Sequence, residues 1–273
     1  MGTHVMSCAM TATDLAIGHD GRVLIEGIDL DLRPSELVAL IGNNGTGKST
    51  LLDTLAGLRS PMRGHVTTEG RDVRALSPRD RARRIAQVLT VRPRSGLLTV
   101  SALVALGRHP WTDALGRESE GDRKAVRDAL ASVDGISLAD RAVATLSDGE
   151  LQKVMIARAL AQDTPILLLD EPTAHLDITN RAMVFALLRR VATERHKAIV
   201  CATHDLQHAL ALADRLLLLR RDGGPWLGDP RMAVREGVIA AAFDCPDAHF
   251  DPATGAFRVF RNDGPPLKGG GPG

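Results

Sequence analysis

The sequence predicts an α/β domain with a mostly parallel central sheet, an antiparallel β lobe and a helical insertion. Three observations predict this fold class: uninterrupted apolar segments, helical segments between them, and alternating segments near the start of the chain. The chain has 273 residues, of which 44% are hydrophobic and 25% charged, so one large domain with a substantial core is expected.

Near the start of the chain, apolar and polar residues alternate in three short segments. These are residues 13–17, 23–25 and 28–32. Alternation with a period of two is typical of antiparallel strands with one face in water. Gly18, Gly21 and Gly27 punctuate these segments, and we expect each glycine to break a strand. This part of the chain is therefore predicted to form the antiparallel lobe.

Three later segments are apolar throughout and are predicted to be strands buried on both faces of a parallel sheet. They are residues 37–41, 166–169 and 198–202, and helices are expected at about 48–57, 151–162 and 181–195. Residues 95–161 have apolar side chains at helical spacing, so they are predicted to be the helical insertion. Residues 1–262 are expected to form one domain, and the Gly/Pro-rich residues 263–273 a disordered tail.

Composition limits the classes of partner. The net charge is +1, from 34 basic and 33 acidic residues, which gives no electrostatic reason to expect nucleic acid as a partner. Three widely spaced cysteines fit a reducing cytosol and neither a disulfide framework nor a zinc site. No secretory segment is recognised, and the longest apolar stretches are far shorter than the roughly 20 residues of a membrane helix. We expect any association with a membrane to come through a partner protein.

A phosphate-binding loop is predicted directly after the first buried strand. Gly42, Asn43, Asn44, Gly45, Thr46, Gly47, Lys48 and Ser49 match G-x-x-x-x-G-K-[ST], and Thr50 continues into a helix. The glycines let backbone N–H groups turn toward a phosphate at the helix N-terminus. Lys48 would contact the outer phosphates, and the Ser49 hydroxyl would bind Mg²⁺. The alternative, a glycine-rich turn with a surface lysine, does not account for the order of strand, loop and helix.

Two carboxylates and a histidine follow the other buried strands. Asp170 and Glu171 end one strand, and His204 follows another, so all three are expected at the sheet edge where open α/β sheets bind ligands. Asp170 would hold Mg²⁺, Glu171 would orient the attacking water, and His204 would contact the γ-phosphate. Alternatively, His204 and His208 could bind zinc from one helix face, but a third ligand and a catalytic acid are missing.

The segment Leu146, Ser147, Asp148, Gly149 and Glu150 has the pattern of a helix cap. Ser147 can cap the following helix while Glu150, three residues later, reaches back to it. A cap by itself would explain these residues structurally. A helix N-terminus with a glycine also suits a phosphate.

With these motifs in this order, the chain resembles the ATPase subunits of ABC transporters from Asp14 to about Arg261. In that family, the segment that precedes the helix expected here at 151–162 is called the signature segment, and it normally reads Leu-Ser-Gly-Gly-Gln. Ala174, His175, Leu176 and Asp177 stand where the family has its D-loop, which crosses the dimer interface. The resemblance implies a RecA-like P-loop fold and a homodimer that holds two ATP·Mg²⁺, each also bound by the signature segment of the opposite subunit.

The sequence departs from the family's pattern in three of its motifs. Asp148 and Glu150 replace a glycine and the glutamine of the signature, and we expect Asp148 to point away from the partner's phosphate. Thr90 stands where the family has a glutamine that contacts Mg²⁺, while Gln87 falls too early and is expected within a strand. The chain has no tyrosine, so His19 is expected to take the place of the aromatic residue that stacks on adenine. A solvated turn histidine is the other interpretation of His19.

Residues 98–111 resemble the importer branch that serves uptake of iron–siderophore complexes, haem and cobalamin. The resemblance then implies an ATPase at the cytoplasmic face of the membrane, attached to permease subunits that work with an extracellular or periplasmic substrate-binding protein. The alternatives are an ABC subunit for another cargo, a soluble ABC ATPase without a transport role, a P-loop kinase or GTPase, and a non-catalytic nucleotide-binding module. The basic stretch of residues 71–84 is interpreted as a solvated helix face.

Overall fold

The computed structural model describes residues 8–89, 98–113, 116–174, 176–220 and 223–259. The chain divides into two compact units, Met1–Pro230 and Arg231–Gly273, and each is described by itself. Every residue predicted to act in the functional site belongs to the first unit.

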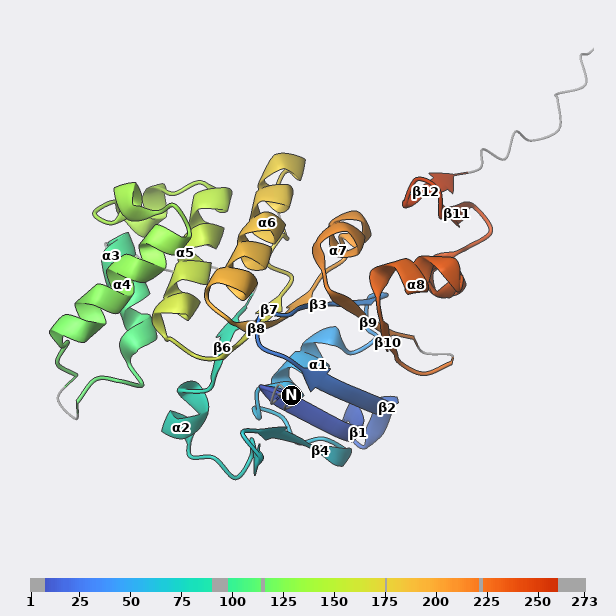
Figure 1. Cartoon of the computed structure of the whole chain (residues 1–273), viewed down its shortest axis with the longest axis horizontal. Coiled ribbons are helices and arrows are strands. Elements are labelled where there is room, and N and C mark those ends of the chain that lie inside the picture. Colours follow the sequence, from blue (N-terminus) through green and yellow to red (C-terminus); the bar gives the residue numbers. More distant parts are fainter. Residues whose placement is uncertain (1–7, 90–97, 114–115, 175, 221–222, 260–273) are drawn as a thin grey trace, which may run out of the picture. The chain divides into compact units, whose positions relative to one another are not determined.

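A six-stranded sheet forms the centre of the first unit (Figure 1). Its strands, in spatial order, are β10 (Trp226–Gly228), β9 (Arg215–Leu219), β3 (Leu37–Gly42), β8 (Ala198–Ala202), β7 (Ile166–Asp170) and β6 (Ile85–Val88). All neighbouring pairs are parallel except β10 with β9. Every residue of β3 and β8 is buried, as uninterrupted apolar strands require. The predicted α/β fold with a parallel sheet is confirmed.

The antiparallel lobe is a second, four-stranded sheet. Its strands, in spatial order, are β2 (Arg22–Leu32), β1 (Met10–His19), β4 (Arg63–Thr68) and β5 (Arg71–Asp72). The expected strand breaks at Gly18 and Gly27 are wrong, because both residues lie inside long strands. A side chain at position 18 would lie 2.1 Å from the carbonyl oxygen of Arg22, so this glycine permits the close approach of β2. Only the glycine at position 21 lies in the turn between the two strands.

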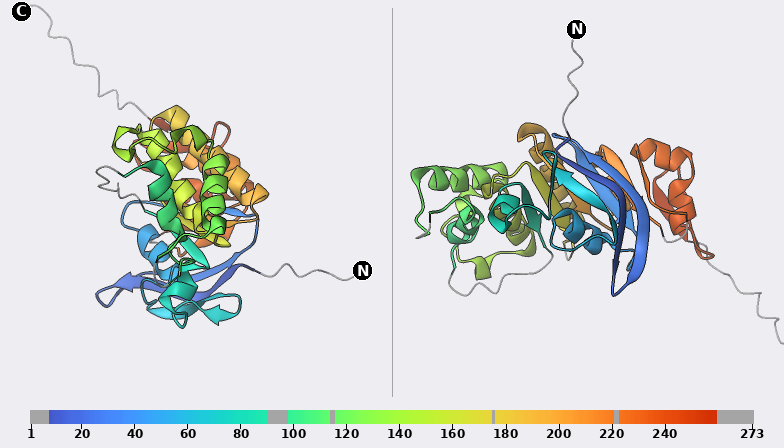
Figure 2. Two further views of the ribbon diagram at one scale, coloured as in Figure 1. Left: turned by 90° about the vertical axis from the view of Figure 1, so that its left-hand side faces the viewer. Right: turned by 90° about the horizontal axis from the view of Figure 1, so that it is seen from below.

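Helices cover the central sheet and form the insertion. The helices beside the sheet are α1 (Lys48–Leu55), α2 (Pro78–Ala82), α6 (Ile178–Glu194) and α7 (Leu206–Leu212). The insertion contains α3 (Val100–Ala105), η1 (Leu106–Arg108), α4 (Glu120–Ser132), η2 (Ile136–Leu138), η3 (Val143–Thr145) and α5 (Asp148–Ala161). Figures 1 and 2 show these green to yellow helices packed together, away from the blue antiparallel strands. The exact limits of the inserted lobe remain a prediction.

Two apolar cores lie on opposite faces of the central sheet. Leu167 and Leu169 of β7 belong to the core that contains α5, α6 and the rest of the insertion. Ile166 and Leu168 of the same strand belong to the core that contains α1, β1 and β2. Because side chains alternate along a strand, this one strand joins both cores and its end is held firmly in place.

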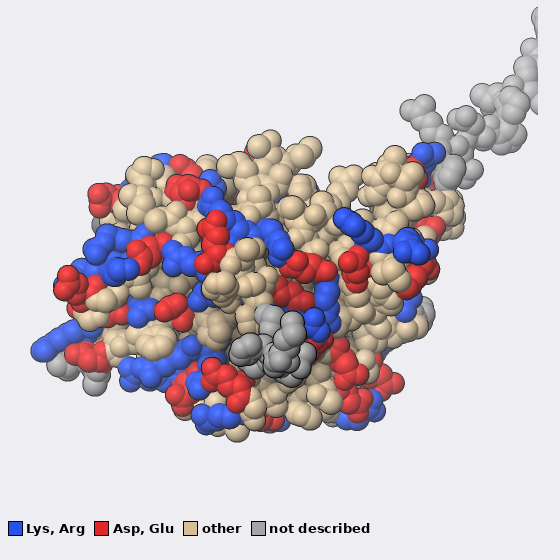
Figure 3. All heavy atoms as spheres, in the orientation of Figure 1, with Lys and Arg blue, Asp and Glu red and all other residues tan. Residues whose placement is uncertain are grey.

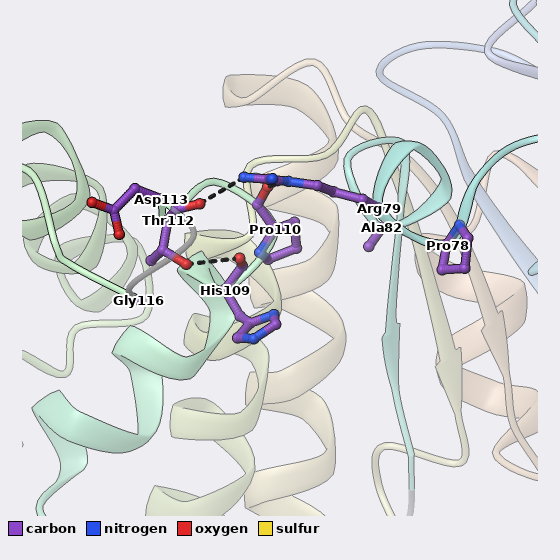
Figure 4. A pocket seen from close by; sticks show the side chains of 8 residues that line it. All are labelled: Pro78, Arg79, Ala82, His109, Pro110, Thr112, Asp113 and Gly116. Atoms are coloured by element: carbon purple, nitrogen blue, oxygen red, sulfur yellow. Dashed lines mark hydrogen bonds between the residues drawn. The ribbon is translucent and has the colours of Figure 1, made fainter.

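The basic stretch is solvent-accessible as expected, since α2 has no buried residue, and several of its arginines also bind backbone carbonyls. Arg79 donates to the carbonyls of Pro110 and Thr112, at 2.9 and 2.6 Å, and Arg83 also donates to Pro110. Figure 4 shows Arg79 reaching from α2 across to the segment after η1, beside a hollow of about 450 Å³. These arginines connect the sheet part of the unit with the helical insertion, which is a structural role that charge patterning alone does not reveal.

The second unit consists of short elements: most of α8 (Pro230–Arg235), then α9 (Val238–Phe243), β11 (Ala248–Asp251) and β12 (Ala256–Val259). The two strands form an antiparallel hairpin. Phe257 packs edge-on against both Phe243 and Phe250. Within the described part of the whole chain, no helix is long and apolar enough to cross a membrane. On the face displayed in Figure 3, Lys and Arg side chains are interspersed with Asp and Glu.

Candidate active site

The phosphate loop connects β3 to α1 and depends on glycine at specific positions. Gly45 and Gly47 have φ angles of 72° and 101°, which side chains other than glycine rarely adopt. At Gly42, a side chain would lie 2.7 Å from Thr46 Oγ1 and 2.8 Å from the Leu219 carbonyl oxygen. Thr46 closes the loop by donating its hydroxyl to the carbonyl of Asn43 at 2.8 Å. The loop is therefore a tight turn that leads directly into the N-terminus of α1.

Lys48 is buried inside this loop. Its Nζ donates to the carbonyl oxygen of Gly42 at 2.9 Å, and it lies 4.0 Å from Glu171 Oε1. Burial lowers the pKa of Lys48, while the negative charges of Glu171 and Asp170 act in the opposite direction. A buried ammonium group beside two carboxylates is held where it can meet an anionic ligand of the loop.

Asp170 ends β7 beside the start of α1 and forms a hydrogen bond with Ser49. Burial raises the pKa of Asp170, and the charges of Glu171 and Asp53 raise it further, against the effect of the Ser49 hydrogen bond. A hydroxyl and a carboxylate in contact, surrounded by further acidic groups, are oxygen ligands of the kind that Mg²⁺ prefers. The residues present therefore fit a magnesium ion. Thr90, the third predicted ligand, lies outside the described residues.

Glu171 follows in a strained backbone conformation. Its φ angle is 48°, in the left-handed region, and its N–H donates to the carbonyl of Ala202 on the neighbouring strand β8 at 3.0 Å. The carboxylate oxygen Oε1 lies 2.6 Å from His204 Nε2. Strain at a residue fixed by its neighbours is a recurring feature of catalytic positions. The structure thus brings Lys48, Asp170, Glu171 and His204 together at one edge of the sheet.

His204 and His208 have separate partners. His204 faces Glu171, whereas His208 Nδ1 lies 2.8 Å from Asp205 Oδ2 and its ring stacks on Phe185 at 5.5 Å between centroids. The two imidazoles therefore do not act as a pair, which disfavours the zinc alternative. His208 is a packing residue at the base of α7.

The signature segment (residues 146–150) forms the predicted cap of α5. Ser147 accepts from the N–H of Glu150, and the Glu150 carboxylate accepts from the N–H of Ser147 at 2.8 Å. Arg141 donates to Glu150 at 2.7 Å. The Ser147 backbone hydrogen bond lowers the pKa of Glu150, and Arg141 adds to this effect against partial burial. Glu150 is thus already paired within its own subunit. Asp148 is exposed, and Leu146 is half-buried against the core of the insertion.

The predicted D-loop leads from Glu171 to α6. The N–H of Ala174 donates to the Glu171 carbonyl at 3.0 Å, and Leu176 is buried. Asp177 caps α6 by accepting from the N–H of Asn180 at 2.7 Å. His175 lies outside the described residues.

The structure leaves one predicted residue apart and adds contacts that were not predicted. His19 is exposed at the end of β1, and its Nδ1 lies 3.3 Å from Asp20 Oδ2. Its place beside adenine remains a prediction. Gln87 lies within β6 as expected, and its amide donates to Asp53 of α1 at 3.2 Å. That contact, like the Arg141–Glu150 ion pair, joins residues with no shared motif, so only the fold reveals it.

Together, these features define a P-loop nucleotide-binding protein of the ATPase class. They are a buried lysine in a glycine loop, a hydroxyl–carboxylate pair and a glutamate–histidine pair, all on a parallel sheet. Residues 25–174 match the family model described as "ABC transporter". The chain is 38% identical to an uncharacterized ABC transporter ATP-binding protein of Methanocaldococcus jannaschii, over 91% of this chain and 86% of that protein. The chain belongs to the ABC transporter family, as an ATP-binding subunit that acts as an ATPase.

Two relatives are named as ATP-binding proteins of import systems. The hemin import ATP-binding protein of Streptomyces coelicolor is 38% identical, over 93% of this chain and 90% of that protein. The cobalamin import ATP-binding protein of Halobacterium salinarum is 39% identical over 93% of this chain, which spans only 63% of that longer protein.

Solved structures agree with the fold. An ABC transporter of proposed metal-chelate type, in an inward-facing conformation, superposes with a TM-score of 0.76 at 28% identity, covering 87% of this chain and 89% of that one. A dimeric bacterial ABC transporter cassette superposes with a TM-score of 0.67 at 26% identity, covering 81% and 98%. The expected ABC ATPase fold is confirmed.

Proposed function

We propose that this chain hydrolyses ATP to power an importer of an iron chelate, such as a siderophore complex or haem, or of cobalamin. The observation that carries the catalytic part is the convergence of Lys48, Asp170, Glu171 and His204 at one sheet edge beside the phosphate loop. The proposed cargo is supported by the import functions for which the relatives from Streptomyces coelicolor and Halobacterium salinarum are named.

In the proposed reaction, backbone N–H groups of the phosphate loop and the N-terminus of α1 hold the β- and γ-phosphates. Ser49 and Asp170 would hold Mg²⁺, which supplies charge neutralisation at the phosphates when it is bound. Glu171 orients the attacking water, and its contact with His204 Nε2 at 2.6 Å fixes the carboxylate. Lys48 and His204 stabilise the negative charge that develops on the transferred phosphoryl group.

Each site would be completed by a second copy of the chain. Ser147 and Gly149 lie at the N-terminus of α5, where backbone N–H groups and the helix dipole favour an anion. We propose that this end of α5 faces the γ-phosphate of ATP held by the partner subunit. The existence of a dimeric cassette structure with the same fold supports this arrangement. Closure of two copies would exclude water and assemble both sites at once.

The remaining partners follow from an import role. We propose that the homodimer binds permease subunits at the cytoplasmic face of the membrane, and that a substrate-binding protein delivers the cargo on the other side. The ATPase itself does not contact the cargo in this arrangement, so cargo identity must be established on the assembled system.

ATP turnover by the purified chain with Mg²⁺ tests the catalytic part. We expect Lys48→Ala to lower turnover at least about 100-fold, because the loop loses its buried positive charge. Lys124→Ala is the matched control. Lys124 is exposed, and within the described residues its only ion pair is with Asp128 on the same helix. Equal turnover by the Lys48 variant and the control would refute the proposed site.

Cargo is tested in vesicles that contain the chain with its permease subunits and binding protein. We expect ATP-dependent uptake of radiolabelled ferric siderophore, haem or cobalamin, and none with Glu171→Gln. Uptake of an unrelated cargo, or ATP turnover that no permease stimulates, would instead favour another transporter class or a soluble ABC ATPase.

A further inference from the structure

One side chain joins the signature segment to the predicted D-loop within a single subunit. Asn180, in the first turn of α6, donates its side-chain Nδ2 to Asp177 Oδ2 at 3.0 Å, and its backbone N–H donates to Asp177 Oδ1 at 2.7 Å. Both oxygens of Asp177 are therefore engaged by the same residue. The bond from Nδ2 orients the Asn180 amide, and the backbone bond holds the Asp177 carboxylate against the same residue.

The other side of this amide faces Gly149. A Cβ at position 149 would lie 2.7 Å from Asn180 Oδ1 and 2.9 Å from Asn180 Cγ, closer than nonbonded atoms approach. Gly149 is buried and is not among the residues with positive φ, so its backbone does not require glycine. Alanine would otherwise be favoured here, within the first turn of α5. The requirement for glycine thus comes from Asn180.

We propose that Asn180 is a positioning residue that sets the spacing between the N-terminus of α5 and Asp177. This inference rests on the proposed function, in which both elements meet the partner subunit's nucleotide. In this role Asn180 is not expected to contact the nucleotide or the reacting atoms. It acts through Gly149, whose lack of a side chain permits the contact, and through Asp177, whose carboxylate it orients. Asn180 belongs to none of the sequence motifs described above.

The spacing between the N-terminus of α5 and Asp177 is expected to affect the closed dimer and to leave the ATP site within each subunit intact. Lys48, Ser49 and Glu171 belong to other elements and make no described contact with Asn180. Loss of the amide is therefore expected to lower turnover and ATP-driven dimerisation while ATP binding by a single subunit stays the same. A misplacement of about 1 Å at a site of this kind can cost on the order of 100-fold in rate.

A double-mutant cycle with Gly149→Ala and Asn180→Ala tests the inference. We expect Gly149→Ala to lower turnover at least 100-fold and Asn180→Ala about 10-fold, both with ATP affinity within twofold of wild type. Adding Asn180→Ala to Gly149→Ala should restore turnover at least 10-fold, because the new methyl group no longer meets the amide. Thr179→Ala, at the exposed neighbouring position, is the control and should behave as wild type.

Two results would overturn the positioning role of Asn180. If the double variant is no more active than Gly149→Ala, glycine is needed there for close approach of the nucleotide, and the positioning role is wrong. Wild-type turnover by Asn180→Ala would also overturn it. Should Asn180→Ala fail to fold, Asn180→Asp keeps the shape, loses the Nδ2 donor to Asp177, and is expected to show the same loss of turnover.

The same cycle measured by thermal unfolding separates this inference from the proposed function. Gly149→Ala should lower the melting temperature of the free chain, and Asn180→Ala should remove most of that effect. Additive changes in melting temperature would overturn the contact whatever the ATPase activity. By contrast, the variants can show this coupling in melting temperature while the wild-type chain hydrolyses no ATP. That result would refute the proposed function and leave the contact standing.

Discussion

At the scale of the single residue, Glu171 shows how this site holds a reactive group. Its left-handed backbone costs about 1 kcal/mol for a residue with a side chain. The N–H bond to Ala202 and the contact with His204 keep it there. Glycine would adopt φ of 48° without that cost, so the glutamate is retained for its carboxylate.

This strain predicts a trade between stability and activity. Glu171→Gly and Glu171→Gln both lose the carboxylate, so both should lower ATP turnover by about 100-fold or more. Glu171→Gly should unfold with a free energy about 1 kcal/mol above that of Glu171→Gln, because only glycine relieves the backbone. Urea unfolding of the two variants measures the difference. A Gln variant as stable as the Gly variant would contradict the strain.

At the scale of the element, α4 depends on a buried ion pair at its first turn. Asp122 is buried, accepts from the hydroxyl and N–H of Ser119, and accepts from Arg108 Nε at 2.8 Å. The Ser119 hydrogen bonds first, and then Arg108, lower the pKa of Asp122 from 3.8 to about 2. Arg108 also donates to the Ala161 carbonyl at the end of α5. The pair therefore joins α4 to α5, the helix that carries the signature segment.

The depressed pKa predicts how stability changes with pH. An aspartate whose pKa is lower in the folded state stabilises the fold above its unfolded pKa, here 3.8, and loses that contribution as pH falls toward about 2. Asp122→Asn should therefore cost roughly 2 kcal/mol at pH 7, with a smaller difference from wild type below pH 4. Urea unfolding of both proteins from pH 7 to pH 3 measures this. A difference independent of pH would contradict the assignment.

At this scale, some features of the fold can be predicted from the sequence and others cannot, for physical reasons. The Ser147–Glu150 cap could be predicted because both hydrogen bonds join residues three apart. The buried strands could be predicted because burial on both faces leaves an uninterrupted apolar run. Gly18 was predicted to end a strand, yet its reason for being glycine is the approach of Arg22 on the next strand. Arg141 and Asn180 depend likewise on contacts that only the folded chain creates.

At the scale of the whole molecule, the catalytic residues and the signature segment are both present in one chain but serve different sites in the proposed dimer. In that dimer, Lys48, Asp170 and Glu171 would act on the ATP bound by their own subunit. Ser147 and Gly149 would act on the ATP of the partner. The pairing of Glu150 with Arg141 inside one subunit leaves the N-terminus of α5 to provide the contacts across the interface.

The mass of Glu171→Gln in solution with ATP and Mg²⁺ tests this central claim most directly. Because the variant binds ATP but cannot hydrolyse it, light scattering should show twice the mass of the chain with ATP and a single chain with ADP. Adding Lys48→Ala to Glu171→Gln should abolish the dimer. A Glu171→Gln variant that stays at the mass of one chain with ATP, or that hydrolyses ATP at the wild-type rate, would contradict the account.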